Sequence, residues 1–154
     1  MLVAPNTPQQ GTESESTEIT NHPFFPSLLL ADFRDVERVD ATASESRAGV
    51  ALYNAMLDAN TRLADWMAEQ TAQGITELSN VPQKPGHPPG ANLRLYKQAV
   101  YSLAKAALLE LLHDYDSTGD TPTENSNAAN ECRRNAAWAI NDLTNVPRVT
   151  IELI

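Results

Sequence analysis

Cysteine is almost absent from the chain, which has Cys132 alone among its 154 residues. A single cysteine excludes an intrachain disulfide and any zinc site built on several cysteines. Histidine is also rare, and no two histidines have the spacing of metal ligands; they are His22, His87 and His113. We therefore expect neither a metal centre nor a bound cofactor.

Long hydrophobic runs are missing as well. The most apolar stretch, residues 99–112, is too short to cross a bilayer and is interrupted by Lys105 and Glu110. Residues 1–23 have no basic side chain and no apolar core of the kind that a signal peptide needs. The sequence therefore predicts a soluble chain that does not enter a membrane.

Basic residues are scarce, since 11 Lys and Arg stand against 20 Asp and Glu and give a formal net charge of −9. An acidic surface repels the DNA backbone, so we expect no binding through neutralised phosphates. The same surface can still lie beside DNA and let the duplex slide past. We also find no Gly-rich phosphate loop, nucleophile elbow or pair of catalytic carboxylates. We therefore expect that the protein is not an enzyme.

Composition divides the chain into three parts. Residues 1–22 are rich in Thr, Ser, Glu, Gln and Pro and predict a flexible N-terminal arm. Residues 23–146 carry helical patterns and form the predicted domain, and residues 147–154 form a C-terminal strand. Within the domain, residues 81–90 contain four prolines and two glycines, which excludes a regular helix or strand there.

Two long helices are expected on either side of this proline-rich loop. Residues 42–45 have the form of a capping box, and the helix that follows should end at Gly74. Its apolar stripe, taken from helical spacing, consists of Val50, Tyr53, Met56, Leu57, Leu63 and Met67. The second helix, residues 92–113, is apolar over most of its circumference, which is typical of the central helix of a bundle.

A short helical turn over residues 31–38 and a last helix over residues 128–143 complete the expected domain. The last helix follows a polar loop, residues 114–127, that contains Gly119 and Pro122. Its inward positions are Ala129, Cys132, Ala136, Ile140 and Leu143. Trp138 falls on a different face, where we expect it to pack against a neighbouring protein or to form a second core face.

The C-terminus alternates apolar and polar residues with the period of a strand. Val149, Ile151 and Leu153 share one face and alternate with polar side chains. The predicted bundle offers no second strand, so we expect this segment to pair with another chain. The expected fold class is therefore mainly α: a small helical bundle with an extended N-terminal arm and an intermolecular C-terminal strand.

The loop after the second long helix resembles an incomplete calcium loop. Residues 114–119 place oxygen ligands and a glycine as such a loop requires, but Asn125 stands at the twelfth position, where a bidentate Glu is needed. An ordinary acidic loop between helices is the simpler interpretation. The acidic side chains here form either a solvated surface or a patch that faces a DNA channel; they are Asp114, Asp116, Asp120 and Glu124.

Several segments in one order resemble the head completion (GpL-type) proteins of contractile-tailed temperate phages, over about residues 19–154. The segments are Phe24-Phe25-Pro26, Ala31-Asp32-Phe33-Arg34, Arg38-Val39-Asp40, Ala64-Asp65-Trp66, Tyr96, Ala99-Val100-Tyr101, Ala104-Lys105-Ala106, Asp114-Tyr115-Asp116, Arg133-Arg134, Trp138-Ala139-Ile140 and Val149-Thr150-Ile151-Glu152-Leu153-Ile154. The N-terminal arm and the loop at 82–90 depart from the family, the arm by its length and the loop by its prolines.

The resemblance implies a structural virion protein, assembled in the host bacterial cytoplasm, that forms a ring on the portal protein after DNA packaging. The ring, with about twelve copies as the portal implies, would stabilise the filled head and offer a surface to the neck or tail terminator protein. DNA would pass nearby without specific binding. The expected contacts with the portal or a neighbouring copy are Phe24, Phe25, Trp138, Val149, Thr150, Ile151, Glu152, Leu153 and Ile154.

Three other interpretations stay open at the level of sequence. Another ring protein of the neck, such as a tail terminator, would be richer in strand. A calcium-binding helical module would use residues 114–125 as its loop. An acidic inhibitor that mimics DNA would need carboxylates at the spacing of duplex phosphates, whereas the predicted helix faces show only local clusters.

Because the twelfth calcium ligand is missing and Pro122 lies inside the loop, we expect calcium to leave the protein unchanged. Calorimetric titration of the purified chain with CaCl₂ should give no heat of binding. Tight binding that disappears in an Asp114→Ala, Asp116→Ala double variant would contradict this expectation.

Overall fold

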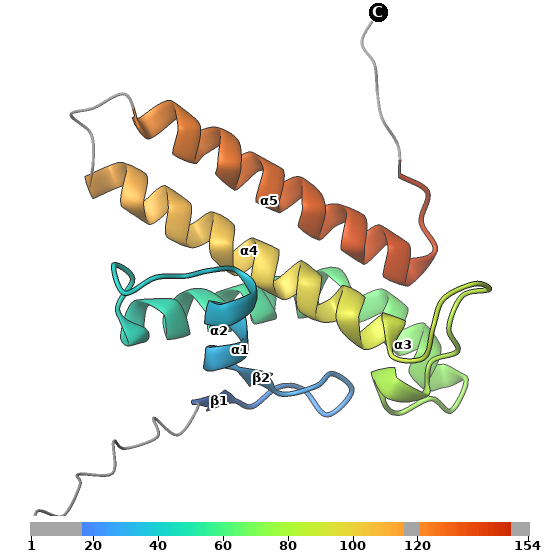
Figure 1. The fold of residues 1–154 in the computed structure, drawn as a ribbon. Coiled ribbons are helices and arrows are strands. Elements are labelled where there is room, and N and C mark those ends of the chain that lie inside the picture. Colours follow the sequence, from blue (N-terminus) through green and yellow to red (C-terminus); the bar gives the residue numbers. More distant parts are fainter. Residues whose placement is uncertain (1–16, 116–120, 149–154) are drawn as a thin grey trace, which may run out of the picture.

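The structure is a computed structural model that describes residues 17–115 and 121–148, and it is mainly helical, as predicted (Figure 1). It contains two short strands, five α-helices and one 3-10 helix within these ranges. In chain order they are β1 (Glu18–Ile19), β2 (Leu28–Leu29), α1 (Leu30–Val36), α2 (Glu45–Arg62), α3 (Ala64–Ala72), η1 (Leu78–Asn80), α4 (Ala91–Tyr115) and α5 (Thr121–Thr144).

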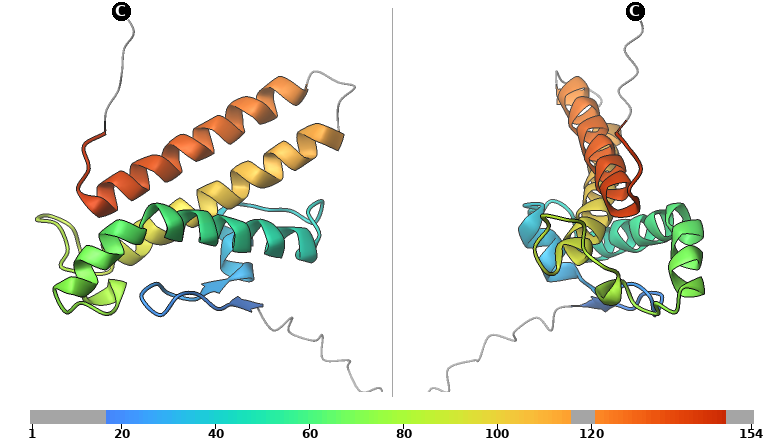
Figure 2. Two further views of the ribbon diagram at one scale, coloured as in Figure 1. Left: turned by 180° about the vertical axis from the view of Figure 1, so that it is seen from behind. Right: turned by 90° about the vertical axis from the view of Figure 1, so that its right-hand side faces the viewer.

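Helix α4 is the centre of the fold, which confirms the prediction from its apolar circumference. It packs along α5 on one side and against α2 on another, and α1 and η1 also lie near it (Figures 1 and 2). Its buried apolar side chains are spread around the helix; they are Tyr96, Ala99, Val100, Tyr101, Leu103, Ala104, Ala106 and Leu108. A helix with neighbours on several sides buries most of its circumference, and α4 therefore fixes where the other helices lie.

The single long helix predicted before Gly74 is in fact two helices. It begins two residues later than the capping box suggested, because Ser44 and not Thr42 is the N-cap, and the Ser44 hydroxyl accepts a hydrogen bond from the Arg47 N–H at 3.2 Å. It breaks at the fully buried Leu63, between α2 and α3. Gly74 ends α3 with φ +85°, and the Ile75 N–H bonds back to the Gln70 carbonyl, so the predicted C-terminus is confirmed.

The inward face of α2 differs from the predicted stripe. Its buried side chains are Ala48, Ala51, Leu52, Ala55, Met56 and Ala59. Val50, Tyr53 and Leu57 instead point outward, with exposed fractions of 59%, 49% and 46%. Small alanine side chains let the axes of two helices approach closely, and this close packing against α4 sets the rotation of α2.

Helix α5 begins earlier than predicted. The polar loop was expected to reach residue 127, but the helix starts at Thr121, and Pro122 lies in its first turn, where a helix tolerates proline. Its inward face is largely as predicted, since Ala129, Ala136, Ile140 and Leu143 are buried. Cys132 is only half-buried.

A short antiparallel ladder closes the other side of the domain. Glu18 pairs with Leu29 and Ile19 with Leu28, so residues 17–22 belong to the folded domain rather than to the arm. The chain therefore has a strand pair of its own, which the sequence did not predict. The ladder and α5 lie on opposite sides of α4 in each view (Figures 1 and 2).

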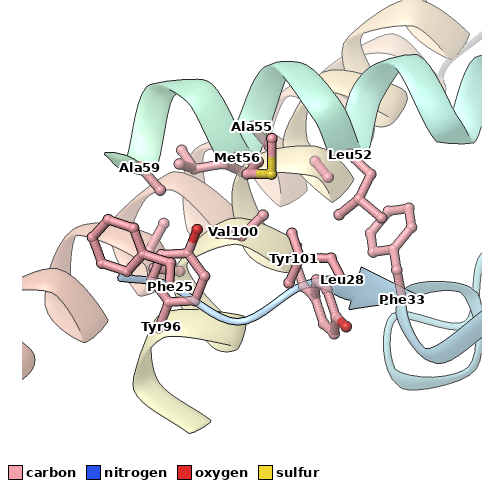
Figure 3. Close-up of a cluster of buried hydrophobic side chains, with 14 of the residues drawn as sticks. Phe25, Leu28, Phe33, Leu52, Ala55, Met56, Ala59, Tyr96, Val100 and Tyr101 are labelled. Carbon is pink, nitrogen blue, oxygen red and sulfur yellow. The ribbon is translucent and has the colours of Figure 1, made fainter. Parts of the chain in front are cut away.

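Three polar side chains from distant segments form a closed ring of hydrogen bonds inside the fold. The Asn21 amide donates to the Tyr96 hydroxyl at 2.7 Å, the hydroxyl donates to Asn60 Oδ1 at 2.7 Å, and the Asn60 amide donates to Asn21 Oδ1 at 2.8 Å. Phe25 stacks on the Tyr96 ring at 4.6 Å (Figure 3). Burial raises the pKa of Tyr96 to about 12, so its hydroxyl stays protonated as a donor.

Replacing Tyr96 with Phe should destabilise the fold, because the partly buried amides of Asn21 and Asn60 would each lose a hydrogen-bond partner. Leaving such groups unpaired costs about 1–3 kcal/mol in the free energy of unfolding. Urea denaturation followed by circular dichroism measures the change. The matched control is Tyr53→Phe, which removes an exposed hydroxyl and should change the free energy by no more than about 0.5 kcal/mol. Equal losses in the two variants would contradict a structural role for the ring.

Candidate functional site

The described residues contain no group of three or more His, Cys, Asp and Glu side chains placed to hold a metal ion. Burial is the main cause that raises the pKa of the Cys132 thiol, which therefore stays protonated at neutral pH and is a poor nucleophile. No helix in the described ranges has the length and apolar character of a membrane span. The candidate sites are surfaces that present exposed or unusual side chains.

The chain reverses its direction where α5 ends. Asn145 has φ +62°, a left-handed conformation that Asn adopts more readily than most residues. The Val146 N–H then donates to the Asn141 carbonyl at 3.0 Å, which is the long hydrogen bond of a Schellman motif. This motif turns residues 146–148 back along α5.

Arg148 is held on α5 by two side chains. Its guanidinium lies 4.9 Å from the centre of the Trp138 ring, and Arg134 lies 5.1 Å from the same ring. Arg148 also donates two hydrogen bonds to the Asp142 carboxylate, of which the Nε–Oδ1 bond is 3.1 Å. We call Arg134, Trp138, Asp142 and Arg148 the Trp138 clamp. It attaches the start of the C-terminal segment to the outer side of α5.

The hydrogen bonds from Arg148 are the main cause that lowers the pKa of Asp142, and Arg148 and the more distant Lys84 and His87 lower it further through their charges. Lys84 and His87 belong to the proline-rich loop, which lies beside the C-terminal end of α5 (Figure 1). The ion pair is largely exposed, so it contributes little to overall stability. Its effect is local, because it determines which way the chain leaves α5.

Phe24 and Phe25, which we expected at an interface, lie instead in the core. Their exposed fractions are 3% and 5%. The two rings meet edge to face at 5.0 Å, and Phe24 also contacts Trp66 edge to face at 6.0 Å. Two adjacent aromatics are best buried together, so their side chains support the fold and are not available to a partner.

The predicted acidic patch is described only in part. Asp114 and Glu124 are exposed, whereas Asp116 and Asp120 lie outside the described residues. Since α5 starts at Thr121, residues 121–125 follow a helix rather than the open course of a calcium loop, which argues against the calcium interpretation. Glu110, near this end of the hairpin, forms an ion pair with Arg133 of α5.

A cleft that the sequence did not predict lies between α1 and α4, with a volume of about 560 Å³. Asp32 accepts hydrogen bonds there from Lys97 at 3.0 Å and from the Tyr101 hydroxyl at 2.6 Å. The Tyr101 hydrogen bond lowers the pKa of Asp32 most, and burial raises that of Tyr101. These groups satisfy one another and tie α1 to α4, an arrangement that calls for no catalytic role.

The fold and composition define a class of protein: a small, acidic, mainly helical domain. The family of phage head completion proteins (GPL) matches residues 19–154, and the chain belongs to this family. No curated protein and no solved structure matches the chain. The resemblance identified from the sequence is thereby confirmed, and the protein is a virion component with a structural role in completing the phage head.

The Trp138 clamp should be visible in the fluorescence of a Trp66→Phe protein, in which Trp138 is the remaining tryptophan. Arg148→Ala should make Trp138 more accessible to acrylamide, because one of the two guanidinium groups over its ring is lost. Arg94→Ala removes an exposed arginine elsewhere and serves as the control. Unchanged quenching in Arg148→Ala would contradict the clamp.

The same signal should depend on pH. The folded pKa of Asp142 is lowered from 3.8, so the contribution of the ion pair is present above this value and is lost as the pH falls through the folded pKa. Acrylamide quenching of Trp138 should therefore be unchanged between neutral and weakly acidic pH. It should increase only at pH values below 3.8, where Asp142 becomes protonated and releases Arg148.

Proposed function

We propose that the protein forms a ring on the portal after DNA packaging, stabilises the filled head and provides the attachment surface for the neck or tail. Its partners are then the portal protein, neighbouring copies, in a ring of about twelve, and the tail or neck terminator protein. The ring is assembled in the host cytoplasm. The observation that carries this proposal is the match to the head completion family over residues 19–154.

The C-terminal segment Val149–Ile154 supplies the contact with the portal or with an adjacent copy. It lies outside the described residues, and the proposal rests on its alternating sequence and on the described residues that precede it. Backbone groups of a buried strand need partners, and strand addition to another chain supplies them. Val149, Ile151 and Leu153 would fill pockets on the partner and set the register.

The position of Arg148 favours a partner outside the chain. Six residues in extended conformation reach about 20 Å at most. The β1–β2 ladder of the same chain lies beyond α4, across helix layers that are each about 8–10 Å thick. A path around α4 is longer still, so the segment would reach another chain more readily than its own ladder.

Trp138 contributes to the interface through the clamp in this proposal. It holds Arg148, the residue just before the C-terminal segment, on α5, and its partly exposed ring is free to contact the same partner. Asp114 and Glu124, exposed near the tip of the α4–α5 hairpin, would face the DNA channel. Acidic groups there repel the duplex and let it pass without specific binding.

The rival interpretation as a tail terminator has less support. We expected such proteins to be richer in strand, whereas the described residues contain only two strands of two residues each. The match to the head completion family also favours the first interpretation.

Deleting residues 149–154 should leave a folded helical monomer that cannot join the head, because the described hydrophobic core is built from side chains between Phe24 and Leu143. The free energy of unfolding should change by less than about 1 kcal/mol. Incorporation into phage heads, DNA retention and tail attachment measure the function. If heads with the shortened chain retain DNA and accept tails normally, the strand-addition proposal is wrong.

A matched pair of triple variants separates the apolar face from the length of the segment. Val149→Ser, Ile151→Ser and Leu153→Ser together should abolish incorporation, because the pockets would remain unfilled. Val149→Ile, Ile151→Val and Leu153→Ile together keep the apolar face and should preserve it.

A further inference from the structure

The outer side of α2 presents an apolar surface that the chain itself leaves uncovered. Val50, Tyr53 and Leu57 follow one another at helical spacing and are 59%, 49% and 46% exposed. We call these three side chains the α2 ridge. An exposed row of large apolar side chains is typical of an interaction surface. The ridge ends beside Asp58 and Arg62, which form an ion pair with each other.

The α1–α4 cleft offers a concave surface of similar mixed character. Its lining includes Val36, whose side chain is 59% exposed, together with Glu37, Arg94 and Gln98. Within the part of the chain that the structure describes, the side chains of Glu37 and Arg94 form no hydrogen bond or ion pair. The cleft therefore offers an apolar side chain, Val36, beside two charged side chains, Arg94 and Glu37, and Glu37 also interacts with the charge of Lys105.

The ridge and the cleft lie on different sides of the molecule. In the end-on view of Figure 2, α1 lies on one side of α4 and α2 on the other. Two different surfaces on opposite sides of one chain fit a head-to-tail contact, in which each copy uses its ridge on one neighbour and its cleft on the next. Repetition of such a contact closes a ring when the rotation allows it.

We propose that the α2 ridge of one copy docks into the α1–α4 cleft of the next copy. The charges at the two surfaces complement each other, because Asp58 can pair with Arg94 and Arg62 with Glu37. Such rim pairs contribute to orientation and specificity more than to affinity. The apolar part of the contact is the packing of the α2 ridge of one copy against Val36 in the cleft of the next copy. The inference rests on the proposed ring and specifies the surfaces that would form it.

Chemical cross-linking in phage particles tests this contact. Cys132→Ser provides a chain without cysteine, with Cys132→Ala as a second background if the first folds poorly. On that background, Val36→Cys marks the cleft and Leu57→Cys marks the ridge. A short bis-maleimide applied to particles that carry both substitutions should give a ladder of linked multimers on a denaturing gel.

Three controls make the result decisive. Each single cysteine variant should give no ladder, and Val36→Cys combined with Asn130→Cys, on the exposed side of α5, should also give none. Maleimide labelling of the free chains should show that every introduced thiol reacts. Dimers from Leu57→Cys alone would show a symmetric contact and overturn the proposal.

The double variant could be present in the particles and its thiols could react, yet no ladder could form. This result would overturn the ridge–cleft contact and leave the head completion role intact. A different outcome is that the cysteine-free parent chain folds but is not found in the particles. That outcome would overturn the proposed function, and this contact with it.

Discussion

The hydrogen-bonded ring of Asn21, Asn60 and Tyr96 is the constraint on which the rest of the structure depends. It joins the N-terminal segment, α2 and α4, three parts of the chain that no short-range pattern connects. Each group would be costly to bury without its partners, so the ring permits one arrangement of these elements and penalises alternatives. The stacking of Phe25 on Tyr96 then brings the aromatic pair of the N-terminal segment into the core.

Once α4 is fixed in this way, it acts as the support for three different surfaces. Helix α5 lies along one side and carries the Trp138 clamp at its C-terminal end, while α1 and α2 lie on other sides and carry the cleft and the ridge. Helices α1 and α2 also contact each other directly, and α4 packs against α2 and α5. A rigid central helix therefore holds the proposed contacts at fixed angles, as a ring component requires.

The chemistry of the chain suits a structural role in the head. The shifted pKa values of its ionisable groups are explained by burial, as for Glu37 and Cys132, or by local partners, as for Asp142 with Arg148. Such pairs fix the positions of helices and chain ends. Together with the family match, they fit a protein with a structural role in completing the phage head.

The amino-acid sequence by itself determined the helical class, the central position of α4, the helix end at Gly74 and the family, because these follow from local patterns and from composition. It did not determine which side of α2 faces inward: Val50, Tyr53 and Leu57 are the larger apolar residues, but the alanine face packs more closely on α4. Likewise, the burial of Phe24 and Phe25 and the contact of Arg148 with Trp138 depend on partners brought together by chain reversals and long-range packing. Only the tertiary structure decided these features, since side chains that meet through space need no regular spacing along the chain.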